Sequence, residues 1–149
     1  MSPLRLYLLS GLGIVTGGLI AFQSVLNAGL GQRIGNLGSV LVLTFISAIV
    51  LIVLIFFLPS TSNFRNLPDI SEWYLYFGGF LGVAILAAPI YLVPRIGTTS
   101  TLIAIVLGQS LIALAIDHFG LFASPKIEIN LARGAGVLLV AIGAYLVGR

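Results

Sequence analysis

Polar side chains recur on one face of the first long apolar segment, and they are well suited to bind a solute. Thr16, Gln23 and Asn27 are spaced by seven and four residues, which places all three on one side of a helix. A carboxamide facing lipid without a hydrogen-bond partner is costly, so this side is expected to face the protein interior. We interpret it as a candidate substrate-binding wall, because amides offer both donors and acceptors. Helix packing is an equal alternative, since Gly13 and Gly17 allow a neighbouring helix to approach and to hydrogen-bond either amide.

A second polar set lies in the fourth apolar segment and contains ionisable side chains. Gln109 falls near the middle of the segment, and Asp117 follows eight residues later on nearly the same face. Asp117 and His118 can each bind and release a proton, so they are candidates for proton coupling, with Gln109 as a candidate substrate ligand. The stronger alternative is that Asp117 and His118 only end a helix near the lipid headgroups, with Gly120 as the C-cap.

Two residues of the third segment bear on movement and on cavity lining. Pro89 lacks a backbone donor and lies inside the segment, so it is expected to bend the helix and is a candidate hinge. Tyr91 lies deep enough to be a candidate substrate contact. Trp73 and Tyr74 instead fall at a predicted membrane interface, where aromatic side chains commonly anchor helices.

Other chemistries are poorly supported by the residue types. The chain contains no cysteine, which removes disulfides, thiol catalysis and cysteine-ligated metals. One histidine beside one aspartate is too little for a nucleophile with its base or for a metal centre, so no enzyme activity, cofactor or metal site is expected. The formal net charge is +3, but the seven basic residues form no stripe along which a phosphate backbone would bind, so no nucleic acid partner is expected.

Five long apolar stretches, separated by short polar turns, must position these side chains. Each has roughly the 17 to 25 residues that a helix needs to cross a bilayer. Lipid offers no hydrogen-bond partner to an open backbone, so we predict helices rather than strands. The stretches run at about 4–30, 38–58, 73–93, 98–119 and 131–147.

Composition assigns the whole chain to the membrane. Of its 149 residues, 59% are hydrophobic and 7% are charged, which would not make a soluble surface. The connections are too short to fold alone, so we expect one all-α transmembrane domain over residues 1–149. The first stretch carries Gln23 and Asn27 in its far end and no convincing cleavage site, so it is expected to be a retained helix rather than a signal peptide.

Basic residues are divided almost evenly between the two faces of the membrane. With five crossings, the side of the N-terminus holds four, Arg5, Arg65, Lys126 and Arg133, and the other side holds three, Arg33, Arg95 and Arg149. Orientation follows the excess of Lys and Arg in short loops, so a near-even count predicts insertion in both directions. The alternative is that Arg5, close to the first helix, places the N-terminus in the cytoplasm.

Four ordered motifs give the chain a resemblance to a known family. They are Gly18-Leu-Ile-Ala-Phe-Gln23-Ser-Val-Leu-Asn27-Ala-Gly-Leu, Leu-Val-Pro94-Arg95-Ile-Gly97, Gly108-Gln109 and Asp117-His118-Phe-Gly120. Over essentially its whole length the chain resembles the YdcZ-like family of the drug/metabolite transporter superfamily. That superfamily is built from two five-helix repeats of inverted topology, so the resemblance implies half of a ten-helix transporter, completed by an antiparallel homodimer. It also implies that the working face is marked by Gln23, Asn27, Gln109 and Asp117.

These observations predict a small integral membrane transporter of a bacterial inner (plasma) membrane. A cavity near the bilayer midplane, lined by the first and fourth helices of two copies, would open alternately to either side. No Asp, Glu or Lys falls at mid-membrane, which favours a small polar or weakly charged solute, or a facilitated carrier, over a cation/proton antiporter. We expect the protein to be an exporter. The expected partners are the solute, the lipid bilayer and a second copy. Two alternatives stay open: a structural or assembly subunit of a larger membrane complex, and a small dual-topology channel.

Overall fold

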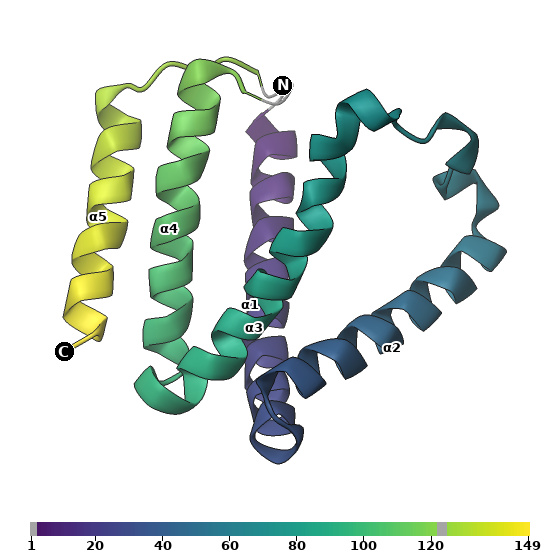
Figure 1. The fold of residues 1–149 in the computed structure, drawn as a ribbon. Coiled ribbons are helices and arrows are strands. Elements are labelled where there is room, and N and C mark those ends of the chain that lie inside the picture. Colours follow the sequence, from purple (N-terminus) through teal and green to yellow (C-terminus); the bar gives the residue numbers. More distant parts are fainter. Residues whose placement is uncertain (1–2, 122–124) are drawn as a thin grey trace. The chain divides into compact units, whose positions relative to one another are not determined.

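The computed structural model describes residues 3–121 and 125–149, and all regular structure in these residues is helical. Five α-helices follow one another, joined in one place by three short 3₁₀ helices (Figure 1). The elements are α1 (Pro3–Ile34), α2 (Asn36–Phe57), η1 (Pro59–Thr61), η2 (Phe64–Asn66), η3 (Ile70–Tyr76), α3 (Phe77–Ile96), α4 (Thr98–Phe119) and α5 (Leu131–Val147). The predicted all-α class is confirmed for this part of the chain.

Within the described residues, four helical stretches are long and apolar enough to cross a membrane. They are Tyr7–Ile34, Asn36–Phe57, Ile70–Ile96 and Thr98–Phe119. Helix α5 is also apolar but shorter, with 17 residues. A helix of that length reaches about 25 Å, slightly less than the roughly 30 Å of a bilayer's hydrocarbon core.

Some helix ends differ from the sequence expectation, and at the C-terminal ends of α1 and α3 a glycine, rather than a change in polarity, stops the helix. Helix α1 continues four residues past Leu30 and ends at Ile34. Helix α3 begins at Phe77 instead of Trp73, because the preceding turns are 3₁₀ and Glu72 departs from helical geometry. At its other end α3 continues through Pro94 to Ile96.

Two of the interhelical turns are built alike. A single glycine separates α1 from α2 and α3 from α4: Gly35 with φ 81° and ψ 158°, and Gly97 with φ 79° and ψ 162°. Both close an Arg-Ile-Gly sequence, and L side chains rarely adopt this conformation. The carbonyl of each glycine accepts the first hydrogen bond of the next helix, from Ser39 N at 2.9 Å and from Thr101 N at 3.2 Å. The Ser39 and Thr101 side chains are both fully buried.

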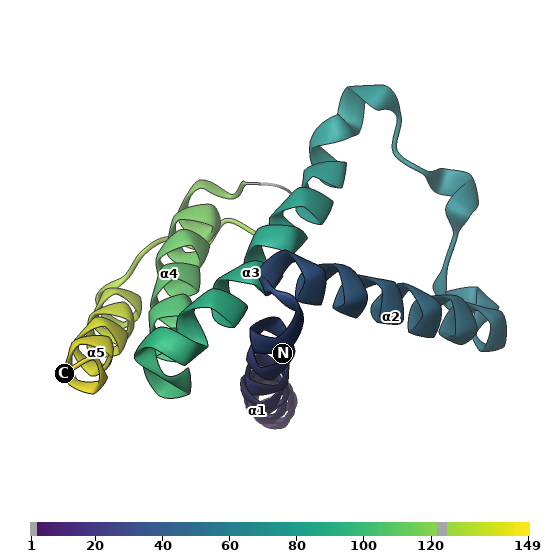
Figure 2. The same cartoon turned by 60° about the horizontal axis from the view of Figure 1, so that its bottom comes forward.

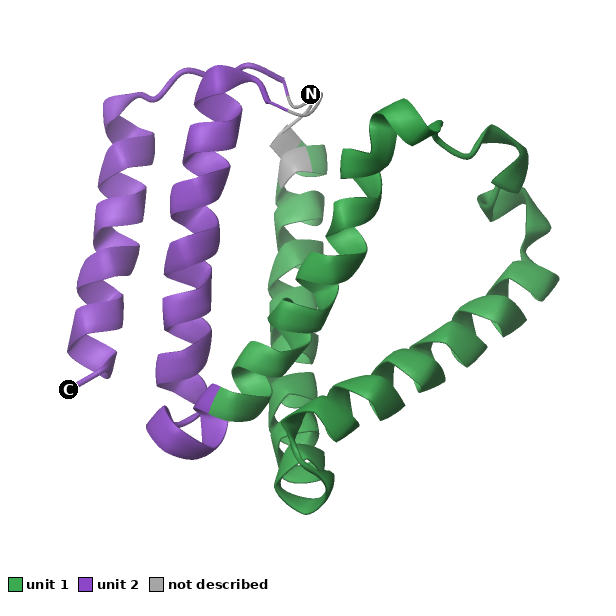
Figure 3. Ribbon diagram, in the orientation of Figure 1, with its two compact units in different colours: residues 1–91 green, residues 92–149 purple. Residues whose placement is uncertain are grey.

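The chain divides into two compact units, Met1–Tyr91 and Leu92–Arg149, with the boundary inside α3 (Figure 3). In the first unit, α1 and α2 meet near the Gly35 turn and then diverge (Figures 1 and 2). The buried residues of α2 are accordingly Ser39 and Val40, at its first turn. The rest of α2 exposes large apolar side chains, a surface suited to lipid or to another copy.

One close contact joins α3 to α1 within the first unit. Ile90 is 1% exposed, and its Cγ2 methyl lies where a Cβ on Gly31 would sit, with only 2.2 Å between the two positions. Only glycine at this point of α1 accommodates the Ile90 side chain. The two residues therefore meet in a close contact between α3 and α1.

In the second unit, α4 and α5 lie side by side and antiparallel (Figure 1). Gly120 ends α4 in the left-handed conformation with φ 62°, as the sequence predicted for a C-cap. The connection to α5 is tied back to α4, since Ile127 N donates to the Asp117 carbonyl at 2.8 Å. At the opposite end of the unit, the Ser100 hydroxyl donates to the Val147 carbonyl at 3.4 Å.

Candidate functional site

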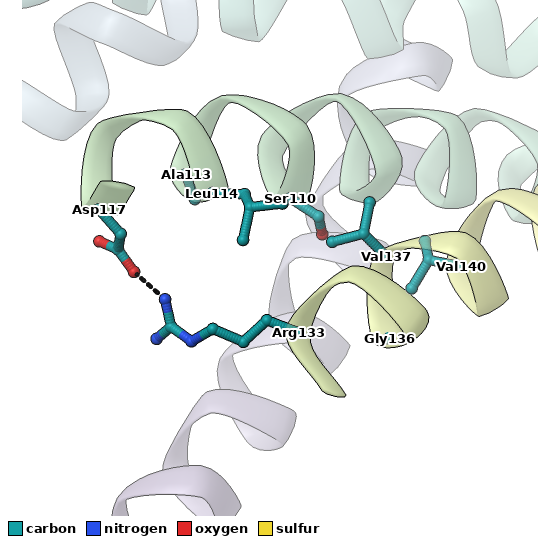
Figure 4. Close-up of a pocket in the computed structure, with 8 residues that line it drawn as sticks. All are labelled: Ser110, Ala113, Leu114, Asp117, Arg133, Gly136, Val137 and Val140. Carbon is teal, nitrogen blue, oxygen red and sulfur yellow. Dashed lines mark hydrogen bonds and ion pairs between the residues drawn. The ribbon is translucent and has the colours of Figure 1, made fainter. Parts of the chain in front are cut away.

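A groove of about 280 Å³ runs between α4 and α5 of the second unit (Figure 4). Its walls are mostly aliphatic, and two charged side chains of opposite sign lie at one end. The lining residues are Ser110, Ala113, Leu114 and Asp117 from α4, and Arg133, Gly136, Val137 and Val140 from α5. The Ser110 hydroxyl donates to the Val106 carbonyl at 2.7 Å, and its oxygen can still accept a hydrogen bond.

The two charges form an ion pair. Arg133 Nη1 donates to Asp117 Oδ2 at 3.0 Å, with the side chains 34% and 28% exposed. Both residues are also held by their backbones: the Asp117 carbonyl accepts from Ile127 N, and Arg133 N donates to the Asn130 side chain at 2.9 Å. Asn130 is the N-cap of α5, so the hydrogen bond that caps the helix also fixes the position of the Arg133 backbone.

Each charge lies at the helix end that disfavours it. Asp117 is in the last turn of α4, where the helix dipole is negative, and Arg133 is in the first turn of α5, where it is positive. The dipole contribution alone would favour the opposite placement by about 0.3–1 kcal/mol for each residue. The pairing of the two side chains offsets this, so each depends on the other. A third charged group that entered the groove would meet both.

Of the sequence candidates in α4, the structure brings Asp117 to the groove and leaves the others off its lining. Gln109 is exposed, and its neighbour Ser110 faces the groove instead. His118 is half-buried, with its ring edge-on to Phe119 at 5.0 Å between centroids. Its Nδ1 atom is buried and has no hydrogen-bond partner in the described part of the chain.

Arg133 is the functional candidate that sequence reasoning missed. In the sequence-based prediction its charge bears only on the orientation of the chain in the membrane. The available signal was an acidic residue at the end of one apolar run and a basic residue at the start of the next, joined by a short loop. Such a pair can meet when the two helices pack antiparallel.

In the first unit, the residues of the predicted polar face of α1 differ in how far they are buried. Asn27 is 5% exposed and lies beside two buried serines, Ser24 and Ser39. The Ser39 hydroxyl donates to the Asn27 carbonyl at 3.3 Å, and no hydrogen bond to the Asn27 carboxamide is made within the described residues. Gln23 and Thr16 are exposed in this unit, since the buried residues of α2 are confined to its start, near the Gly35 turn. The Thr16 hydroxyl donates to the Leu12 carbonyl at 2.9 Å.

The two candidates in α3 have different surroundings. Pro89 is half-buried within the continuous helix Phe77–Ile96 and directly precedes Ile90, which anchors α3 on Gly31. Tyr91 is 48% exposed. Their roles as hinge and substrate contact stay predictions.

Long apolar helices that leave most of their surface uncovered define an integral membrane protein. The family model described as "Putative inner membrane exporter, YdcZ" matches residues 8–146. The chain belongs to this family and is an integral protein of the inner membrane. Membership in an exporter family also points away from catalysis. No curated protein and no solved structure matches the chain.

Proposed function

We propose that the protein exports a small polar or weakly charged solute across the inner membrane, working as an antiparallel homodimer with alternating access. The observation that carries this proposal is the match to an exporter family over residues 8–146, nearly the whole chain. A groove that ends in an ion pair supports it, because paired opposite charges can remain ionised within an apolar protein.

A second copy is proposed because one chain leaves polar and small residues uncovered. Gln23 and Thr16 are exposed in the first unit, which in lipid favours another protein surface. On the same helix, a Cβ added at Gly13 or Gly17 would meet nothing within 4 Å. Such small residues allow close helix association in membranes. We propose that this stretch of α1 contacts the second copy, with α5 as the fifth crossing of each.

The antiparallel arrangement is supported by the four-to-three division of basic residues. Two copies of opposite orientation would reproduce the inverted repeats from which alternating access follows. In this scheme Asn27, Gln23 and Gln109 contribute hydrogen bonds to the solute. Asp117 is the proposed proton-coupling residue, with His118 beside it, because protonation of the carboxylate would release Arg133 and change the groove.

Orientation gives the first test, and the absence of cysteine makes it simple. Thr61→Cys in the α2–α3 connection and Gln32→Cys next to the Gly35 turn are one crossing apart and face opposite sides of the membrane. In each variant, a membrane-impermeant maleimide should label a fraction of the chains in intact cells and the remainder only after the cells are permeabilised. The fractions labelled from outside should add up to about one, and the cysteine-free chain is the control. Labelling of each position from a single side would refute the antiparallel dimer.

Transport by the purified chain is the second requirement. Reconstituted alone in liposomes, it should carry solute with saturable flux and with counterflow of labelled solute. Flux without saturation or counterflow would identify a channel. Absence of flux with a well-folded, doubly oriented chain would favour an assembly subunit.

A further inference from the structure

The α4–α5 groove has the features of a site for one kind of molecule, and this inference rests on the proposed function. We propose that the groove binds a compact zwitterion that carries a short aliphatic group. Its acid group would lie on Arg133, its ammonium group on Asp117, and its apolar part along the aliphatic walls. The inference thus gives the exported solute a chemical class.

The two charges of the groove are complementary to those of a zwitterion. Arg133 Nη1 and Asp117 Oδ2 are 3.0 Å apart, and about a third of each side chain is exposed, so a small molecule can reach both. A zwitterion would place a charge of opposite sign against each member of the ion pair. A simple anion would do so at Arg133 only and would also meet the like charge of Asp117, and a simple cation would do the reverse. In a low-dielectric surrounding an uncompensated charge is strongly unfavourable.

The hydrogen-bonding geometry agrees with this assignment. A guanidinium group presents a planar set of donors that matches a carboxylate or phosphate in a bidentate manner. A carboxylate accepts from the several donors of an ammonium group. Ser110, on the same helix as Asp117, offers a further acceptor oxygen within the groove.

The size and walls of the groove limit the apolar part of the ligand. Its volume of about 280 Å³ is just below the roughly 300–1,000 Å³ of pockets that hold drug-sized ligands, which fits a small solute. Ala113 and Leu114 face Val137 and Val140 across it (Figure 4). Gly136 leaves additional room, since a Cβ built on it would meet nothing within 4 Å.

Two sources supply this chemistry: a free aliphatic amino acid and the headgroup of a zwitterionic phospholipid. Binding should be measured with radiolabelled L-valine on the purified full-length chain, in nanodiscs of anionic phosphatidylglycerol and in nanodiscs containing zwitterionic phosphatidylethanolamine. Valine binding in both identifies the free solute. Valine binding that phosphatidylethanolamine suppresses supports the zwitterion site and assigns its occupant to the lipid.

Single-charge analogues test the central claim. Isovalerate lacks the ammonium group and isobutylamine lacks the acid group, so each should displace valine at least tenfold more weakly than unlabelled valine does. Glycine, which lacks the aliphatic group, should also be at least tenfold weaker. Failure of valine to bind in both kinds of nanodisc, or displacement by a single-charge analogue equal to that by valine, would overturn the proposal.

Two variants test whether valine binds in the groove, and neither removes only one of the two charges. Gly136→Leu should fill the groove and reduce valine affinity at least tenfold. Gly134→Leu is the matched control, two residues earlier on α5 and therefore on nearly the opposite side of the helix, also with nothing within 4 Å of its Cβ. Asp117→Asn combined with Arg133→Gln removes both charges together and should also abolish binding. Unchanged binding in Gly136→Leu or in the double variant would refute the site.

The binding assay separates this inference from the exporter proposal. A chain that labels from both sides and transports another solute, but does not bind valine, refutes the zwitterion site and leaves the exporter. A chain that binds valine with the expected selectivity but shows no flux or counterflow refutes the exporter and leaves the site.

Discussion

Substituting Gly31 by alanine should break the contact that anchors α3 on α1. The new Cβ would lie 2.2 Å from Ile90 Cγ2, whereas carbon atoms in ordinary contact are about 3.5–4.0 Å apart. One side chain or one helix must therefore move by more than about 1 Å. Ile90 is 1% exposed and branched at Cβ, so its methyl group cannot rotate away freely. Overpacking of this kind costs about 1–3 kcal/mol, and we expect Gly31→Ala to destabilise the protein by that amount.

The measurement is unfolding of the purified protein from mild detergent by increasing mole fractions of dodecyl sulfate. Gly29→Ala is the matched control, because it lies two residues away on α1 and its Cβ would meet nothing within 4 Å. It should be neutral, or stabilising by up to about 1 kcal/mol, since alanine favours helix more than glycine does. Ile90→Leu removes the Cγ2 branch and should restore much of the loss in the Gly31→Ala background. Equal midpoints for both glycine variants, or no rescue, would refute the reasoning.

Three further outcomes follow from contacts within the two units. Gly120→Ala should lower stability by about 1–2 kcal/mol in the same unfolding assay, because the φ angle of Gly120 is 62° and the new Cβ would lie 3.2 Å from Lys126 Cβ. An unchanged unfolding midpoint would contradict this. Asn27→Leu should abolish solute flux while the folded fraction is retained, since no hydrogen bond to the Asn27 carboxamide is made within the described residues. Loss of the fold would instead assign the amide to packing. Gly17→Leu should weaken the dimer without unfolding the chain, since a Cβ at this position meets nothing within 4 Å in the single chain. Crosslinking and light scattering measure the dimer, and an unaltered dimer would exclude this face of α1 from the interface.

The class of the protein and most of its helices could be predicted from the sequence. Apolar runs of membrane length must be helical, because each has to satisfy its own backbone hydrogen bonds in lipid. Helices α4 and α5 have the predicted bounds, and Gly120 caps α4 as its place in the sequence indicated. Hydropathy was a weaker guide at Ile34 and Ile96, where the helices continue through polar residues and Pro94 until a glycine with positive φ ends them.

Only the tertiary structure decided which polar groups meet. Periodicity places Gln23 and Asn27 on one side of α1, yet Asn27 is buried and Gln23 is exposed, because α2 covers α1 only near their turn. Likewise, the sequence placed Asp117 at a helix end, but its pairing with Arg133 depends on how α4 and α5 pack. Helical spacing sets the direction in which a side chain leaves its own helix. It contains no information about which neighbouring helix lies in that direction, and that is settled by the turns and side-chain contacts between helices.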